Sequence, residues 1–223
     1  MIPARGGSRG MAHKNVRRIG GKPMIAYTIE AALASRRIDQ VVVSTDDAGI
    51  ADVARRYGAD APFLRPAELA RDDTPTPPAV EHAVRQVEAA GGQVDVVVTL
   101  QATSPFRDAD AIDQAIELRE RAAAESAVSV AGVDLPASIV GGLVDGRFLP
   151  LPLPPGTDLR RQAAPPAMRL TGAIYVTTRG LLATGVLFDE RPVALVTAGA
   201  AALDVDDLAD LRRARRIARS LRP

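Results

Sequence analysis

Strand-like apolar runs alternate with helical patterns along most of the 223-residue chain. The runs at 41–45 and 94–101 are rich in β-branched residues, which predicts strands that are buried on both faces of a sheet. Stretches with a helical period lie between and after these runs, and Gly91–Gly92 closes the one at 77–90. This alternation is typical of βαβ units. We therefore expect an α/β fold with a doubly wound, mostly parallel sheet.

The predicted elements determine where the loops lie. Strands are expected at 2–4, 41–45, 61–64, 94–101, 127–133, 172–177 and 192–197, and helices at 23–34, 46–58, 77–90, 108–125 and 206–221. Prolines interrupt residues 134–170, which predicts an irregular excursion that has a function or contacts a partner. The length favours one domain, residues 1–223. In such a sheet, the loops at the carboxyl ends of the strands share one mouth, where ligands bind.

The composition excludes several kinds of site and partner. The sequence has no cysteine, which rules out disulfides, thiolate zinc sites and cysteine nucleophiles. His13 and His82 are too few for a histidine-rich metal site. The net charge of +1 argues against a protein that coats nucleic acid. The most apolar stretch, 127–144, is interrupted by Asp134 and Pro136, which argues against a membrane span. We therefore expect a cytoplasmic protein with neither a nucleic-acid nor a membrane partner.

A glycine-rich segment, IPARGGSRGMAHKN, includes the first predicted strand and the loop after it. It matches neither the Walker A loop nor G-x-G-x-x-G, but its glycines permit turns whose N–H groups face an anion. Arg5, Arg9 and Lys14 add cationic donors that suit phosphate oxygens. Lys14 and Lys22 are the only lysines in the sequence, among 28 basic residues. The segment therefore predicts a phosphate-binding loop.

Two further polar segments follow predicted strands. Ser44–Asp47 (STDD) can bring a carboxylate to a metal or a ligand hydroxyl, or Thr45 or Asp46 can simply cap the next helix. Leu100–Arg107 (LQATSPFR) carries neutral hydrogen-bonding groups and the charge of Arg107. A binding loop and a structural turn around its Ser-Pro pair are equal alternatives for this segment.

A pair of carboxylates precedes the last predicted helix, in the segment Leu203–Asp206 (LDVD). On a strand, Asp204 and Asp206 would point to one face, and two adjacent negative charges repel unless a cation lies between them. Mg²⁺ suits such a pair, because it binds through one or two carboxylates together with substrate phosphates. The alternative is that Asp206 and Asp207 cap the last helix, whose many arginines flank an apolar stripe typical of core packing.

Together these segments resemble the acylneuraminate cytidylyltransferases, the CMP-sialic acid synthetases. The matching motifs cover the whole chain in the family's order: IPARGGSRGMAHKN, GGKPMIAYTIEAAL, VVVSTDD, RPAELARDDTPT, LQATSPFR, GAIYV and LDVDDLADL. The resemblance implies a Rossmann-like nucleotidyltransferase fold, with 134–170 as a small dimerisation excursion of a homodimer. It also implies transfer of CMP from CTP to the anomeric hydroxyl of a nonulosonic (sialic-type) acid, with release of pyrophosphate.

The resemblance further implies roles for individual residues in the matching motifs. Nucleotide binding is assigned to Ala4, Arg5, Gly6, Gly7, Ser8, Lys14, Asn15, Arg65 and Thr76, with Thr74 beside them. Binding of the acid sugar is assigned to Gln101, Arg161 and Tyr175. Asp204 and Asp206 are expected to hold Mg²⁺, which Mn²⁺ can replace, and to form the catalytic set with Arg5 and Lys14. Nucleotidyl transfer suits such a set, because positioning and charge neutralisation dominate its catalysis.

Some positions depart from the family pattern. Thr171 stands where the family usually has asparagine, and Leu135–Ser138 lacks the usual basic or aromatic residues. The first predicted strand is also short. These departures leave three alternatives open: a cytidylyltransferase for 3-deoxy-manno-octulosonate, one for a legionaminic- or pseudaminic-type nonulosonate, and a nucleotide-binding homologue with impaired catalysis.

Overall fold

The computed structural model describes residues 1–7, 11–160 and 162–220. The strands are β1 (Ile2–Pro3), β2 (Arg18–Ile19), β3 (Lys22–Pro23), β4 (Val43–Ser44), β5 (Val96–Thr99), β6 (Ser126–Pro136), β7 (Gly141–Val144), β8 (Arg147–Pro150), β9 (Pro166–Thr178) and β10 (Val193–Val196). The helices are α1 (Met24–Ala34), α2 (Ala48–Arg56), α3 (Thr76–Ala89), α4 (Ala109–Arg121), α5 (Arg179–Ala183) and α6 (Leu208–Ser220), and the 3₁₀ turns are η1 (Lys14–Val16), η2 (Ala67–Leu69), η3 (Ala137–Ile139) and η4 (Gly199–Ala202). Within these ranges no helix has both the length and the apolar character that a membrane span requires.

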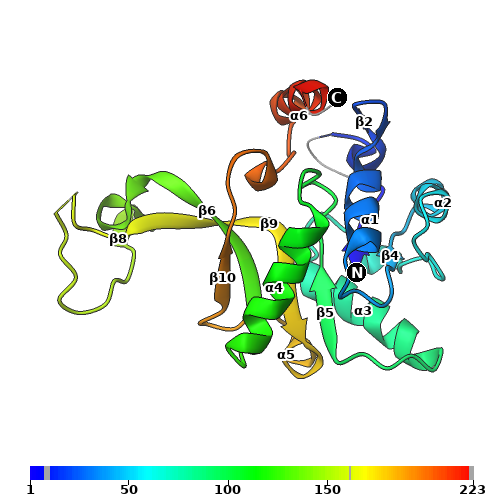
Figure 1. Ribbon diagram of the computed structural model, residues 1–223, viewed down its shortest axis with the longest axis horizontal. Helices are drawn as coiled ribbons and strands as arrows, with labels where there is room; N and C mark the ends of the chain where they lie inside the picture. The colour runs from blue at the N-terminus through cyan, green and yellow to red at the C-terminus, as the bar shows by residue number, and fades with distance from the viewer. Residues whose placement is uncertain (8–10, 161, 221–223) are drawn as a thin grey trace.

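A mixed sheet runs through the centre of the molecule (Figure 1). Four strands pair in the order β10-β6-β9-β5, and β1 pairs with β4 in parallel. The backbone of Met1 joins the two groups, because its nitrogen donates to Val98 O over 2.8 Å and its carbonyl accepts from Leu100 N over 3.0 Å. β9 runs antiparallel to both β5 and β6, whereas β10 is parallel to β6. The prediction of a mostly parallel sheet is therefore confirmed. In this central sheet β9 is the strand that runs in the opposite direction.

Alternating strand residues feed two hydrophobic cores, one on each face of the sheet. Val98 and Ile174 pack with residues of α1, α2 and α4 in one core. Their strand neighbours Val97 and Tyr175 pack with residues of α3 and with Leu182 of α5 in the other. Helices thus cover both faces, as expected of a doubly wound α/β fold.

Residues 134–150 and 166–170 form a β arm, so the prediction of an irregular excursion is wrong for these stretches, whereas 151–160 and 162–165 contain no helix or strand. β6 and β9 continue as an antiparallel pair as far as Pro136 and Pro166, and β7 and β8 form a hairpin. Figure 1 shows this arm projecting from the body of the molecule. Pro136, Pro150 and Pro166 lie at strand ends, where a missing N–H disturbs the ladder little. The prolines therefore limit the strands of the arm without preventing them.

Other predicted elements differ from the structure at their ends. The strand expected at 61–64 does not form, and Asp60 instead makes a single bridge to Val42. The helix expected at 108–125 ends at Arg121, shortly before Ala123 adopts a φ of 47°. The hairpin of β2 and β3 and the short α5 have no counterpart among the predicted elements.

The arginine-rich α6 packs against the N-terminal hairpin. Leu211 and Ala214 of α6 lie with Ile19 and Met24 in a separate hydrophobic cluster. The amphipathic pattern of α6 is therefore confirmed as a packing feature. Lys22 stabilises the same hairpin, because its ammonium pairs with Glu30 and lies 4.1 Å from the ring centroid of Tyr27, both on α1.

Candidate active site

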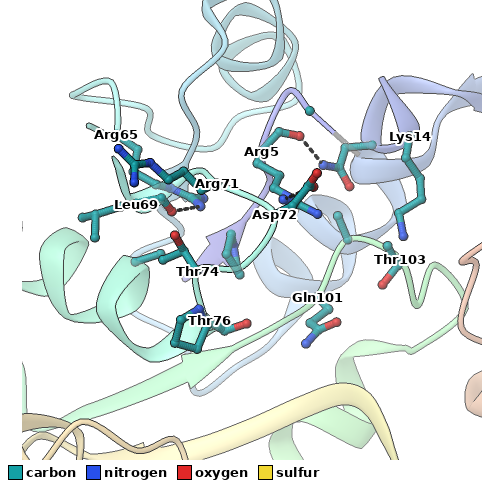
Figure 2. Close-up of a pocket in the computed structure, with 16 residues that line it drawn as sticks. Arg5, Lys14, Arg65, Leu69, Arg71, Asp72, Thr74, Thr76, Gln101 and Thr103 are labelled. Carbon is teal, nitrogen blue, oxygen red and sulfur yellow. Dashed lines mark hydrogen bonds and ion pairs between the residues drawn. The ribbon is translucent and has the colours of Figure 1, made fainter. Parts of the chain in front are cut away.

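A polar cavity of about 230 Å³ lies beyond the carboxyl ends of β1 and β5. The loops after these two strands line it, as the sequence predicted, together with residues 65–76. Figure 2 shows Arg5 and Asp72 between two sides of the cavity, one with Arg65 and Thr76 and the other with Lys14 and Thr103. Segments that are distant in the sequence thus meet around one cavity.

The glycine-rich loop is held by polar contacts to its backbone. Gly6 N donates to Asp46 Oδ1 over 2.9 Å, and Asn15 Nδ2 donates to the carbonyl of Arg5 over 2.9 Å. A Cβ at Gly6 would lie 2.9 Å from the Cβ of Asp47, so only glycine fits at this position. Asn15 and Asp46 therefore fix the path of the loop that carries Arg5 into the cavity.

The remaining residues assigned to this loop have different surroundings. The side chain of Ala4 is buried in the core, so this residue has only backbone atoms to offer a ligand. Gly7 lines the cavity, and a Cβ added to this residue would have no other atom within 4 Å. Ser8 and Arg9 lie outside the described residues.

The side of the cavity that carries Arg65 and Thr76, two residues assigned to nucleotide binding, is built around Arg65. Its Nε donates to Ser44 Oγ over 3.0 Å, Nη2 donates to Ser44 O, and Nη1 donates to Leu69 O over 3.4 Å. Burial lowers the pKa of the Arg65 guanidinium, although the charge of Asp46 opposes this shift. Thr76 begins α3 and lines the same side. Arg65 is thus a rigid wall of the cavity.

The STDD segment serves mainly to order this region. Asp47 caps α2, since its Oδ1 accepts from Ile50 N over 3.0 Å, and Thr45 Oγ1 accepts from Asp47 N over 3.1 Å. The alternative in which Thr45 or Asp46 caps this helix is therefore wrong, because the cap is Asp47, one or two residues further along. Asp46 instead supports the glycine-rich loop through Gly6.

The two predicted metal ligands lie beside Lys14. Leu203–Asp206 forms a loop between η4 and α6, so the strand assumed for this pair is absent from the described structure. The Lys14 ammonium, whose side chain is 15% exposed, lies 3.0 Å from Asp206 Oδ1. Asp207 caps α6, because its Oδ1 accepts from Ala209 N and Asp210 N. The side chain that caps α6 is therefore that of Asp207. The alternative in which Asp206 also caps this helix is not supported by these hydrogen bonds.

Asp204 has the more perturbed environment of the two aspartates. Burial raises its pKa, and the nearby charge of Asp206 adds to this shift, while a hydrogen bond from Thr103 and the charge of Lys14 oppose it. Within the described part of the chain, Asp204 Oδ1 is buried without a hydrogen-bond partner. A buried carboxylate oxygen of this kind is costly unless a ligand satisfies it.

Two of the residues assigned to the sugar lie near Asp204. A Cβ at Gly172 would lie 3.3 Å from Gln101 Oε1 and 3.8 Å from Asp204 Oδ2, so these oxygens converge on that glycine. Tyr175 packs within the core and its ring stacks on Phe188 with centroids 6.0 Å apart. Burial raises the pKa of the Tyr175 hydroxyl, and the charge of Asp204 contributes. Arg161 lies outside the described residues.

Thr171, the departure from the family pattern, is turned into the protein. Its side chain is 2% exposed, and its Oγ1 lies 2.6 Å from Ser129 Oγ on the neighbouring strand. The hydroxyl thus stabilises the pairing of β6 and β9.

Comparison with known proteins identifies the family. The model of the cytidylyltransferase family matches residues 1–140. The chain belongs to the cytidylyltransferase family. The CMP-N,N'-diacetyllegionaminic acid synthase of Legionella pneumophila is 35% identical over 213 residues, which cover 92% of this chain and 89% of that protein. The N-acylneuraminate cytidylyltransferase of Escherichia coli is 33% identical over 216 residues, which cover 96% of this chain but 50% of that protein.

The fold of this cytidylyltransferase is also that of solved nucleotidyltransferases. A CMP:2-keto-3-deoxy-manno-octonic acid synthetase, solved in complex with CTP, superposes with a TM-score of 0.73 at 20% identity, covering 98% of this chain and 97% of that one. The Rossmann-like nucleotidyltransferase fold is therefore confirmed.

A divalent cation fits the carboxylates of this cytidylyltransferase. The unsatisfied Asp204 Oδ1 and the largely exposed Asp206 supply oxygen ligands next to Thr103 and Lys14, which line the cavity. Among the described residues, no group of three or more acidic or histidine side chains is arranged to hold a metal. A cation bound here would therefore take its other ligands from substrate oxygens and water.

Three residues at or beside the cavity are not among the site residues predicted from the sequence. Asp72 pairs with Arg5 over 2.6 Å, Arg71 lines the cavity beside it, and Thr103 faces Asp204. All three lie within two of the motifs that carry the family resemblance, RPAELARDDTPT and LQATSPFR. Their proximity to the glycine-rich loop depends on tertiary contacts, so the motif positions were the only signal available.

Proposed function

We propose that this enzyme transfers CMP from CTP to the anomeric hydroxyl of a nonulosonic (sialic-type) acid and releases pyrophosphate. One observation carries the proposal: a cavity lined by Arg5, Lys14, Arg65 and Arg71 adjoins the Asp204–Asp206 pair, and Lys14 bridges the two. Cations suit a triphosphate, and the carboxylates suit the divalent cation that accompanies it.

The residues of the chain act by holding and neutralising charge. The anomeric hydroxyl oxygen attacks the α-phosphorus of CTP, the bond from that phosphorus to the bridging oxygen breaks, and the hydroxyl proton passes to solvent. Arg5 and Lys14 are placed to neutralise the negative charge that accumulates on the departing pyrophosphate. Bound Mg²⁺, or Mn²⁺ in its place, would add Lewis-acid activation of the phosphate and the attacking hydroxyl at Asp204 and Asp206.

Gln101 supports an acceptor site next to the carboxylates. Its side-chain oxygen and that of Asp204 converge on Gly172, which leaves a polar edge beside the nucleotide cavity. Similarity over nearly the whole chain to a legionaminic acid synthase makes a legionaminic-type acid a second candidate for the acceptor. Because CTP is a cytoplasmic metabolite, the proposal places the enzyme in the cytoplasm and treats residues 1–223 as one catalytic domain.

A substrate panel tests this function. We expect the protein with CTP and Mg²⁺ to release pyrophosphate with at least one of N-acetylneuraminic, legionaminic and pseudaminic acids, and not with 3-deoxy-manno-octulosonate. Coupled phosphate detection measures the rate, and calorimetry measures CTP binding alone. Turnover restricted to the octulosonate would contradict the proposal, and CTP binding without turnover of any acid would favour an impaired homologue.

The β arm supports a homodimer as part of the same proposal. Its hairpin, the end of β6 and η3 expose large apolar side chains: Leu135, Ile139, Leu143, Val144, Phe148 and Leu149. Exposed apolar surface of this extent is typical of protein–protein contacts. A second copy of the chain is the partner that the proposal assigns to it, and the arm would then lie at the dimer interface.

Charged substitutions in the arm are expected to break the dimer. Leu143→Asp with Phe148→Asp places two carboxylates in the apolar hairpin, where burial of a charge is costly. Light scattering coupled to size-exclusion chromatography should show a monomer for this variant and a dimer for the wild type. Leu33→Asp, at an exposed leucine on α1, is the matched control and should remain dimeric. A wild-type monomer at micromolar concentration would contradict the proposal.

A further inference from the structure

Arg107 is a buried cation for which the proposed chemistry has no use. Its side chain is 4% exposed, and it is not among the residues that line the nucleotide cavity. Within the described part of the chain its Nε is buried without a hydrogen-bond partner. Burial lowers the pKa of this guanidinium to about 9, so it still carries its charge at neutral pH. A buried charge is costly to maintain, which calls for a reason beyond packing.

The other two nitrogens of Arg107 connect α1 to the loop after β5. Nη1 donates to Thr28 Oγ1 on α1 over 2.8 Å, and Nη2 donates to the carbonyl of Gln101. The same carbonyl accepts from Ser104 N over 3.3 Å, which closes the turn at 101–104. Arg107 therefore anchors the backbone of Gln101 to a rigid helix.

The side chain of Gln101 emerges from this anchored backbone toward the acceptor side. Gln101 lines the cavity, and its Oε1 lies next to Gly172, as does Asp204 Oδ2. The negative charge of Asp204 partly opposes the lowering of the Arg107 pKa by burial. A rotation of the 101–104 turn would move Gln101 while leaving Arg5, Arg65 and Thr76 in place.

We propose that Arg107 is a positioning residue that fixes Gln101 toward the acid sugar. The proposal rests on the proposed function, because Gln101 is assigned to the acceptor there. It predicts a larger defect for the sugar than for CTP, because the anchored Gln101 is assigned to the sugar and Arg107 itself does not line the nucleotide cavity. A guanidinium is suited to the task, because its planar fork can bind two acceptors in fixed directions.

Arg107→Met tests the proposal, because methionine fills a similar volume without charge or donors. We expect kcat/KM for the acid sugar to fall about 10-fold, as for loss of one charged hydrogen bond, while the calorimetric Kd for CTP stays near the wild-type value. Arg107→Lys should recover part of this loss. Arg179→Met is the matched control: it removes an arginine paired with Glu81 and Glu88, far from Gln101 in the fold, and should leave the sugar kinetics unchanged.

Two further measurements separate positioning from general stability. In a Gln101→Ala background, Arg107→Met should have little additional effect, because Arg107 acts through Gln101. Hydrogen exchange should become faster at Ser104 N–H in Arg107→Met and in Arg107→Lys to a smaller degree, and not in Arg179→Met. This exchange readout holds even if the wild type turns over none of the acids. Unchanged exchange at 101–104, or equal losses in CTP binding and sugar kinetics, would overturn the proposal.

Discussion

Replacing Asp204 with asparagine is expected to lower kcat for pyrophosphate release about 1,000-fold, because the change removes a negative charge where the proposed metal and triphosphate would meet. Asparagine keeps the shape of the side chain, so the core around Leu203 and Val205 should be undisturbed. Pyrophosphate release measured against Mg²⁺ concentration gives the loss in turnover. Electron paramagnetic resonance of Mn²⁺ in the presence of CTP should show weaker binding of the cation.

Asp207→Asn is the matched control for this prediction. It makes the same change in charge three positions along, and asparagine can replace aspartate as the N-cap of α6. We expect this variant to keep the activity and Mg²⁺ dependence of the wild type. The metal assignment is wrong if Asp204→Asn turns over normally, or if the control loses as much activity as Asp204→Asn.

Lys14→Met is expected to reduce kcat/KM for CTP about 100-fold, as for loss of one charged group that stabilises the transition state. Lys14 lines the cavity and pairs with Asp206, so its loss would leave Asp206 without this cationic partner beside the proposed triphosphate. Steady-state kinetics with CTP as the varied substrate provides the measurement. Lys14→Arg should recover only part of the activity, because a guanidinium differs from an ammonium in shape.

The second lysine of the chain serves as the control for the first. Lys22→Met removes the pair with Glu30 and the contact with the Tyr27 ring, so the melting temperature should fall slightly. Its kinetics should match those of the wild type, because Lys22 is not a lining residue of the cavity. Equal kinetic losses in the two lysine variants would mean that Lys14 acts through the fold and not on the triphosphate.

Much of the fold could be predicted because it depends on local pattern. The β-branched run at 94–101 and the amphipathic stretch that became α3 each carry their own period, and buried strands and helices follow from such periods. The arm was missed because prolines were taken to exclude strands, although proline is tolerated at strand ends. The direction of β9 could not be predicted, since the pairing of a strand depends on its neighbours in space.

The parts of the candidate site that could be predicted are those in which one continuous sequence motif forms one loop. The glycine-rich segment and the aspartate pair each stand in the sequence as recognisable sets, and the structure brings both to the cavity edge through Lys14 and Asp206. The capping residue of α2 was misassigned within STDD, because neighbouring Thr and Asp side chains have similar capping ability. Only the local geometry distinguishes Asp47, which caps, from Asp46, which holds Gly6.

The sequence by itself determined the α/β alternation of most of the chain, the residue types available to the candidate site, and the family. Only the tertiary structure decided which of those groups meet. Lys14 and Asp206 are 192 positions apart, and Arg5 faces Asp72 from another loop. The burial of Arg107 is also a property of the packed state, because it depends on α1 lying over the loop after β5. Such contacts and burial depend on how distant segments pack, and no local pattern encodes that packing.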